Sequence, residues 1–179
     1  MRFATFYTYK TLCMMRVVLV AAACVFPAWV WSYKPVATGT NLYVVVDKSE
    51  NTITLFDATD WLVQWPCTFG NNDISDKMYQ GDRRTPEGKF KITSKYPHKK
   101  WNKFMRIDYP TKTDYEKFEQ RKRQGIIPNS AKIGGDIGIH GTWPHEEWAV
   151  ENLQPWTQGC ISMMNEHLNE LYIAIPTGT

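Results

Sequence analysis

Short runs of apolar and β-branched residues alternate with polar turns over most of the chain after residue 40. Leu42–Val46, Thr52–Phe56 and Trp61–Phe69 are rich in Val, Ile, Thr, Trp and Phe, and short polar segments separate them at hairpin spacing. Lys89–Thr93 and Ile137–His140 have the same character. The pattern predicts five strands, of which the first three form an antiparallel meander.

Helical patterns are fewer and shorter. Residues 113–116, Thr-Asp-Tyr-Glu, have the spacing of an N-terminal capping box, and Gly125 is a C-terminal stop signal for the helix that would follow. A second helix is predicted over Asn165–Tyr172. The polar segment Tyr96–Ser130 as a whole is interpreted as a solvated helix face or as a lid. Together these elements predict a mainly β fold, a sandwich or an open barrel with two or three short helices.

The first 32 residues have a different character, with three basic side chains and no acidic one. They end in the apolar run Val17–Trp31. Such a segment is typical of an export signal or an N-terminal membrane anchor, and Cys24, which follows three alanines, leaves lipidation as an alternative. We therefore expect an exported protein, in the periplasm or cell envelope, either free or attached to the membrane through this segment.

The rest of the chain is long enough for one domain and too short for two ordinary ones. Residues 33–40 contain Pro and Gly without periodicity and are predicted to be a linker, so the domain spans 41–179. The chain has 21 Lys and Arg against 18 Asp and Glu, and the three cations of the first 32 residues account for the excess. A neutral domain gives no support to a nucleic-acid partner, and we expect a monomer.

Two cysteines remain in the domain, Cys67 and Cys160. A disulfide between them is one interpretation for an exported protein. The other interpretation is a free nucleophile at Cys160, since this residue follows a glycine and precedes a predicted helix. The positive end of that helix would lower the pKa of the thiol.

The histidine that suits such a nucleophile is His140, which ends a predicted strand and is followed by Gly141. An imidazole near the thiol takes its proton, and backbone N–H groups around Gly159 and Cys160 stabilise an oxyanion. The residues therefore predict acyl transfer by a Cys-His pair.

Three ordered segments strengthen this interpretation. They are IHGT at 139–142, TQGCISMMN at 157–165 and, upstream, GDRRTPEGKF at 81–90. They resemble the motifs of the L,D-transpeptidase (YkuD-type) catalytic domain family. The resemblance covers about residues 41–175 and implies the β-sandwich-like fold of that family.

The resemblance also implies roles. Cys160 would be the nucleophile, His140 the proton donor and acceptor, and Gly141 the residue whose carbonyl orients His140, with Gly159 as an oxyanion donor. The substrate would be a peptidoglycan stem peptide, attacked at its third residue with release of the terminal D-Ala. The cellular role would be in cell-wall biogenesis or remodelling, which affects cell shape. No metal or organic cofactor is implied.

Two positions depart from the family pattern. Gln158 stands where many members have His, and Ser162 stands where they often have an Arg that binds a substrate carboxylate. A hydrolase on the same fold therefore remains an alternative, either an L,D-carboxypeptidase or an L,D-endopeptidase that trims murein or releases a wall-linked lipoprotein. A non-catalytic peptidoglycan-binding module is a weaker one, because it would be expected to lose Cys160 or His140.

The remaining histidines and the tryptophans of the spacer carry less information. His98, His145 and His167 form no pair with the spacing of zinc ligands, so no metal site is predicted, and His167 is interpreted as a surface residue. The segment between His140 and Cys160 holds three tryptophans. They are interpreted as loop packing or as contacts to sugar or peptide.

Overall fold

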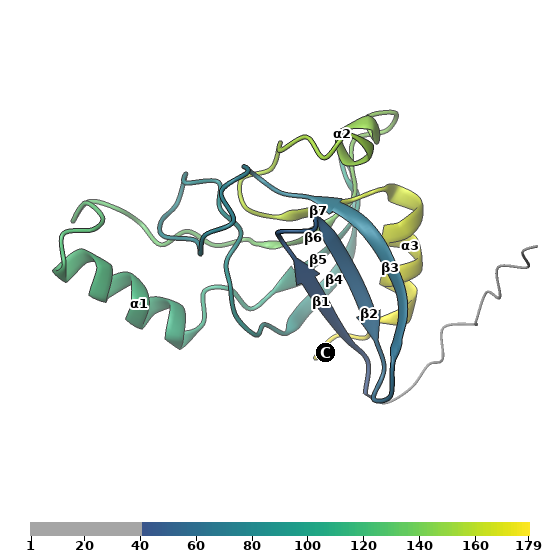
Figure 1. Cartoon of the computed structure of the whole chain (residues 1–179), viewed down its shortest axis with the longest axis horizontal. Coiled ribbons are helices and arrows are strands. Elements are labelled where there is room, and N and C mark those ends of the chain that lie inside the picture. The colour runs from purple at the N-terminus through teal and green to yellow at the C-terminus, as the bar shows by residue number, and fades with distance from the viewer. Residues whose placement is uncertain (1–40) are drawn as a thin grey trace, which may run out of the picture. The chain divides into compact units, whose positions relative to one another are not determined.

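The computed structural model describes residues 41–179, so the export segment predicted over 1–32 and the linker predicted over 33–40 lie outside the described residues. Within 41–179 the chain forms seven strands and three short helices (Figure 1). In chain order these are β1 (Tyr43–Asp47), β2 (Thr52–Phe56), β3 (Trp61–Thr68), β4 (Ile92–His98), β5 (Asn102–Ile107), α1 (Lys112–Arg123), β6 (Gly138–His140), α2 (Trp148–Glu151), β7 (Ile161–Met163) and α3 (Asn165–Ala174).

The seven strands form one sheet in the order β1-β2-β3-β7-β6-β5-β4. All neighbours are antiparallel except β6 and β7, which run parallel. Although β1 and β4 lie at opposite edges, both line one cavity of about 940 Å³, so the sheet curls into a half-barrel. The predicted mainly β fold with two or three short helices is confirmed, and the curled sheet corresponds to the open barrel.

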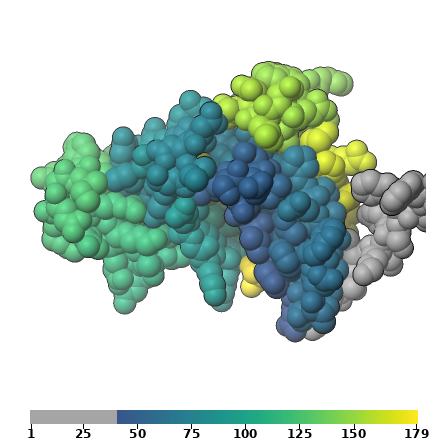
Figure 2. Space-filling view, viewed as in Figure 1, coloured from purple at the N-terminus to yellow at the C-terminus, as the bar shows by residue number. Residues whose placement is uncertain are grey.

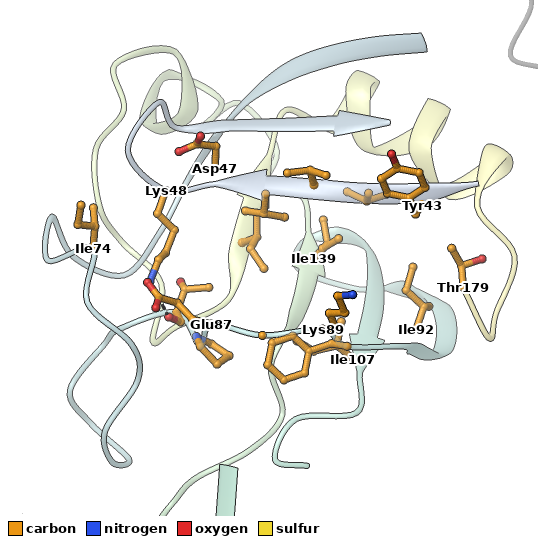
Figure 3. Close-up of a pocket in the computed structure, with 18 of the residues that line it drawn as sticks. Tyr43, Asp47, Lys48, Ile74, Glu87, Lys89, Ile92, Ile107, Ile139 and Thr179 are labelled. Atoms are coloured by element: carbon orange, nitrogen blue, oxygen red, sulfur yellow. Dashed lines mark hydrogen bonds and ion pairs between the residues drawn. The ribbon is translucent and has the colours of Figure 1, made fainter. Parts of the chain in front are cut away.

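The inner surface of this half-barrel, the concave face, carries the hydrophobic core. Helix α3 packs against it through Leu168 and Leu171, which are fully buried. The cavity occupies the part that α3 leaves open, and in Figure 3 Tyr43 of β1 lies across it from Ile92 and Ile107. Its apolar lining includes Ile139 of β6, whose neighbour His140 therefore points to the other face of the sheet.

The hairpin β4–β5 differs most from the sequence prediction. The strand expected over 89–93 begins only at Ile92 and continues to His98, and β5 lies wholly inside the segment interpreted as a helix face or lid. The apolar alternation is masked because lysines take inward positions. Lys95 is one of them, and its Nζ donates to the carbonyl of Ile175, 2.5 Å away, at the end of α3. Its aliphatic stem takes the place of an apolar residue.

Helix α1 has a capping box two residues before the predicted one. Thr111 is the N-cap, its N–H donates to Asp114 Oδ2 at 2.8 Å, and its Oγ1 accepts from the Asp114 N–H at 3.4 Å. An aspartate thus takes the role expected of a glutamate. Gly125 follows the helix with φ +68°, as predicted for a C-terminal stop. Figure 2 shows α1 at the opposite side of the view from β1–β3.

The predicted helix after Cys160 is confirmed as α3, which starts at Asn165 and ends two residues beyond the predicted boundary.

Among residues 41–179, none of the helices has both the length and the hydrophobicity needed to cross a membrane.

Candidate active site

The parallel pair β6–β7 brings the two predicted chemical residues to one face of the sheet. His140 is in register with Ser162, and Ile139 with Ile161, while Cys160 directly precedes β7. Side chains alternate along a strand, so Cys160 and Ser162 share the face on which His140 lies. This outer face of β5, β6 and β7, opposite the concave face, is called the site face below. The sequence-predicted nucleophile and base are therefore diagonal neighbours on it.

One hydrogen bond sets the tautomer of His140. Its Nδ1 lies 2.7 Å from the backbone carbonyl oxygen of Gly141. A carbonyl oxygen only accepts, so Nδ1 carries the proton and Nε2 keeps its lone pair. Gly141 is required here, because a Cβ at this position would lie 2.1 Å from Asn165 Oδ1. That oxygen accepts the N–H of Thr142 at 3.1 Å and so holds the chain after the histidine.

Three aromatic residues, which we call the aromatic clamp, enclose the imidazole. Trp101 stacks on the His140 ring with the ring centres 4.6 Å apart, Phe104 stacks at 5.7 Å, and Trp156 meets it edge-on at 5.3 Å. His140 is 2% exposed. Burial and, to a smaller extent, the nearby His98 lower the pKa of His140 to about 4, although the hydrogen bond that Nδ1 donates to the Gly141 carbonyl raises it. The imidazole is therefore neutral at pH 7 and able to accept a proton.

Trp101 holds the histidine in two ways, and sequence reasoning missed it. Besides stacking, its backbone carbonyl accepts the N–H of Gly141 at 3.1 Å. The residue lies in the β4–β5 turn, and no motif or spacing indicates that this turn lies beside His140. Of the three spacer tryptophans, Trp156 packs on the imidazole, whereas Trp143 and Trp148 are exposed.

Cys160 has a protonated thiol at neutral pH. Burial raises its pKa to about 11, with a smaller increase from Asp136, and these effects outweigh the backbone hydrogen bond at Gly138 and the charges of Lys77 and Arg106, which lower it. Its Sγ donates to the backbone carbonyl of Asp136 at 3.5 Å. The expectation that a helix N-terminus lowers this pKa is wrong, because strand β7 separates the thiol from α3.

The turn before the nucleophile uses its own hydrogen bonds. Thr157 Oγ1 accepts the N–H of Gly159 at 3.2 Å and donates to the carbonyl of Cys160 at 2.7 Å. Gly159 has φ +124°, and a Cβ there would lie 2.7 Å from the Arg84 carbonyl oxygen. In this conformation the Gly159 N–H is therefore not free to act as the oxyanion donor that we predicted. The N–H of Cys160 takes no part in the Thr157 turn.

A comparison with known sequences decides the family. The family model for YkuD, the L,D-transpeptidase catalytic domain, matches residues 41–179. The chain belongs to this family. No curated protein is significantly similar to it in sequence.

Solved structures share the fold of this L,D-transpeptidase-family domain at low identity. Bd1075 of Bdellovibrio bacteriovorus is 19% identical with a TM-score of 0.53, over 77% of this chain and 45% of that one. The helical cell shape determining protein Pgp2 of Campylobacter jejuni is also 19% identical with a TM-score of 0.53, over 79% and 50%. The Ldtfm–avibactam carbamoyl enzyme is 16% identical with a TM-score of 0.50, over 78% and 47%. The chain spans about half the length of these structures.

The upstream L,D-transpeptidase motif, residues 81–90, lies directly behind the nucleophile. Asp82 in this motif pairs with Lys77 at 2.7 Å, and both side chains are almost fully buried. Lys77 Nζ lies 3.4 Å from the place that a Gly159 Cβ would take. Burial would raise the pKa of Asp82, but hydrogen bonds from Lys77 and from the N–H groups of Met78, Tyr79 and Arg84 lower it overall. The motif thus builds a buried ion pair beneath the Gly-Cys turn, and Lys77, outside the motif, was missed.

Cys67 lies on the opposite face from Cys160. It is fully buried in the core beside Met163, and burial raises its pKa to about 12. Both cysteines of the domain are free thiols, so the disulfide alternative is wrong.

Among the other histidines, His98 stacks on Trp101 with the ring centres 4.5 Å apart and so adjoins the aromatic clamp. Within the described residues, no three His, Cys, Asp or Glu side chains gather as a metal site would require. His167 was expected at the surface, but it is half-buried on α3, with its ring centre 6.4 Å from that of Trp65. Its burial follows from its place on the helix face that packs toward β3.

Proposed function

We propose that this chain is an exported L,D-transpeptidase that transfers acyl groups between peptidoglycan stem peptides through a thioester at Cys160. The observation that carries the proposal is the pair of parallel strands, which presents a neutral His140 with a free Nε2 lone pair on the same face as the Cys160 thiol. Membership of the family supplies the substrate class.

The first half-reaction moves one proton and exchanges one bond. His140 Nε2 takes the thiol proton as Sγ attacks the carbonyl carbon of the third stem residue. The tetrahedral intermediate then collapses, its C–N bond breaks, and the imidazolium returns the proton to the nitrogen of the leaving D-Ala. Because the thiol has a pKa of about 11, proton transfer accompanies attack rather than preceding it.

The oxyanion of that intermediate needs a backbone donor. Since the Gly159 N–H is engaged by Thr157, we assign the role first to the N–H of Cys160 itself. The Gly141 carbonyl keeps Nδ1 protonated throughout and stabilises the positive charge that the ring acquires.

In the second half-reaction an acceptor amine attacks the thioester, gives up its proton through His140 and forms the new amide, which restores the thiol. Hydrolysis would follow the same course with water in place of the amine. Membership of the L,D-transpeptidase family supports transfer over hydrolysis.

The cellular setting follows from sequence and relatives. The basic and apolar segment 1–32 supports export to the periplasm or cell envelope, where peptidoglycan is found. One structural neighbour is described as a helical cell shape determining protein, which supports a role in wall remodelling.

The test incubates the full chain with a disaccharide tetrapeptide that ends in D-Ala and follows the products by mass, with Cys160→Ala as control. Release of D-Ala together with cross-linked dimers, and an acid-quenched adduct on the Cys160 peptide with the mass of the donor less D-Ala, is the expected result. Tripeptide without dimers would replace the transferase by a carboxypeptidase. Absence of any adduct on this donor and on cross-linked muropeptides would overturn the proposal.

A further inference from the structure

One exposed cation lies on the site face beside the nucleophile. Arg106 of β5 is in register with Gly138 of β6. On the other side of β6, the register of the parallel pair places Cys160 opposite the same glycine. Phe104, two residues before Arg106 on the same strand, stacks on His140, which fixes the face on which Arg106 lies. Gly138 has no side chain, and the ring edge of Phe104 fills the space its Cβ would take. An apolar surface therefore separates the guanidinium from the thiol.

Asp136 contacts both groups. Its backbone carbonyl accepts from the Cys160 thiol at 3.5 Å, and its carboxylate pairs with Arg106 Nη1. The charge of Arg106 acts on the thiol and lowers its pKa, opposing the burial that raises it. Guanidinium and thiol thus lie on the same face, on the two strands that flank β6.

The pair with Asp136 is a weak one. The side chains of Arg106 and Asp136 are 42% and 78% exposed, and exposed ion pairs contribute little to stability. A carboxylate from outside can therefore displace Asp136 at small cost. The planar guanidinium suits this exchange, because it binds a carboxylate through two parallel hydrogen bonds.

The other cations near the turn do not combine exposure to solvent with an effect on the Cys160 thiol. Lys77, the second cation that acts on the thiol, is buried and paired with Asp82. Arg83 donates to the carbonyls of Pro155 and Thr157, and Arg84 pairs with Asp73. In the described part of the chain, Arg106 is therefore the cation that both acts on Cys160 and meets solvent.

We propose that Arg106 binds the terminal carboxylate of the acyl donor, the carboxylate of the D-amino acid that leaves, with Asp136 occupying its place until the donor arrives. This proposal rests on the proposed function and names a specificity residue for it. The carboxylate of that amino acid is separated from the scissile carbonyl by one amide nitrogen and one carbon, so it must lie close to Cys160, and Arg106 is the solvent-exposed cation whose charge acts on that thiol.

A first experiment needs no turnover. The full chain is treated with iodoacetate, an anion, and with iodoacetamide, its neutral analogue, and alkylation of the Cys160 peptide is followed by mass. Arg106→Gln is expected to lower the iodoacetate-to-iodoacetamide rate ratio at least about fivefold. Asp136→Asn is expected to raise the ratio, and Arg123→Gln, on the far helix α1, to leave it unchanged. An unchanged ratio in Arg106→Gln would overturn the proposal.

A second experiment uses donors that end in D-Ala or in D-alaninamide. The acid is expected to have the lower KM in the wild type, and Arg106→Gln is expected to raise the KM of the acid about tenfold with little change for the amide. Equal KM values in the wild type would overturn the assignment of this carboxylate. If the alkylation ratio falls as expected while neither donor is turned over, the anion site stands and the proposed function fails.

Discussion

The two faces of strands β5, β6 and β7 have different roles, although the same backbone carries both. On the concave face, Met105 and Ile139 belong to the core, and a cavity of about 940 Å³ still remains beside them. On the site face, Phe104 and His140 alternate with these residues, and defined hydrogen bonds hold His140 Nδ1 and the N–H groups of Gly141 and Thr142, which leaves His140 Nε2 free for catalysis. Packing volume governs the first face, whereas the second depends on individual contacts.

The two cysteines provide the sharpest test of this difference. Cys160→Ala is expected to lower turnover by about a thousandfold or more, because the nucleophile is lost, with little change in the free energy of unfolding. Cys67→Ala is expected to keep the turnover per folded molecule and to lower the free energy of unfolding by about 1 kcal/mol, since only packing is lost. Steady-state rates and urea unfolding measure both. Comparable losses of turnover in the two variants would contradict the distinction.

A buried ion pair lies beneath the site face, and its loss should lower the free energy of unfolding more than the loss of a methyl group from the core. Asp82→Ala leaves Lys77 buried without its counter-charge, so the free energy of unfolding is expected to fall by about 3 kcal/mol. The matched control is Asp73→Ala, which removes an exposed partner of Arg84 and should have a much smaller effect. Urea unfolding of the two variants checks this, and equal losses would show that the buried pair has no special role.

The lowered pKa of His140 makes the free energy of unfolding depend on pH. Its pKa is about 4 in the folded protein against an ordinary value of 6.5, so between these values the unfolded chain binds more protons than the folded one. The free energy of unfolding should therefore be fully retained above about pH 6.5 and fall by about 3 kcal/mol on acidification to pH 4. His140→Gln should flatten this part of the profile. Carboxylates with lowered pKa values, such as Asp82, lose their contribution only below this window.

A substitution in the aromatic clamp should lower turnover much less than the loss of the nucleophile. Trp101→Ala is expected to lower turnover about tenfold, because the ring that stacks on the imidazole and fixes its orientation is lost. It is also expected to raise the pKa of His140 toward its ordinary value, because the imidazole becomes less buried. Trp101→Phe should restore part of both. The exposed Trp148→Ala serves as control. NMR titration of the His140 ring gives the pKa, and an unchanged pKa with reduced turnover would assign Trp101 to substrate contact instead.

Much of this arrangement could be predicted from local sequence. The strands β1 to β3 show plain alternation or apolar runs, and His140 and Cys160 are marked by the glycines beside them, which the close approaches at Gly141 and Gly159 require. The strand β5 was missed because lysine stems cover apolar surface that the pattern of residue types does not register.

What could not be predicted depends on contacts between distant segments. Trp101 and Lys77 gain their roles only when the β4–β5 turn and the loop before Asp82 meet the strands that carry the site. The direction of the Cys160 pKa shift was also missed. A helix was correctly expected after the cysteine, but the short strand β7 keeps its N-terminus away from the thiol, and burial then decides the direction.

The parallel pairing of β6 and β7 has a consequence for evolution and engineering. Two adjacent parallel strands require a connection that returns along the sheet, so the segment between His140 and Cys160 is held at both ends by strand register and not by its own length. Changes of length and composition should therefore leave the nucleophile and the base in place where they fall between Thr142 and Trp156, since Gly141, Trp156 and Thr157 themselves hold the site.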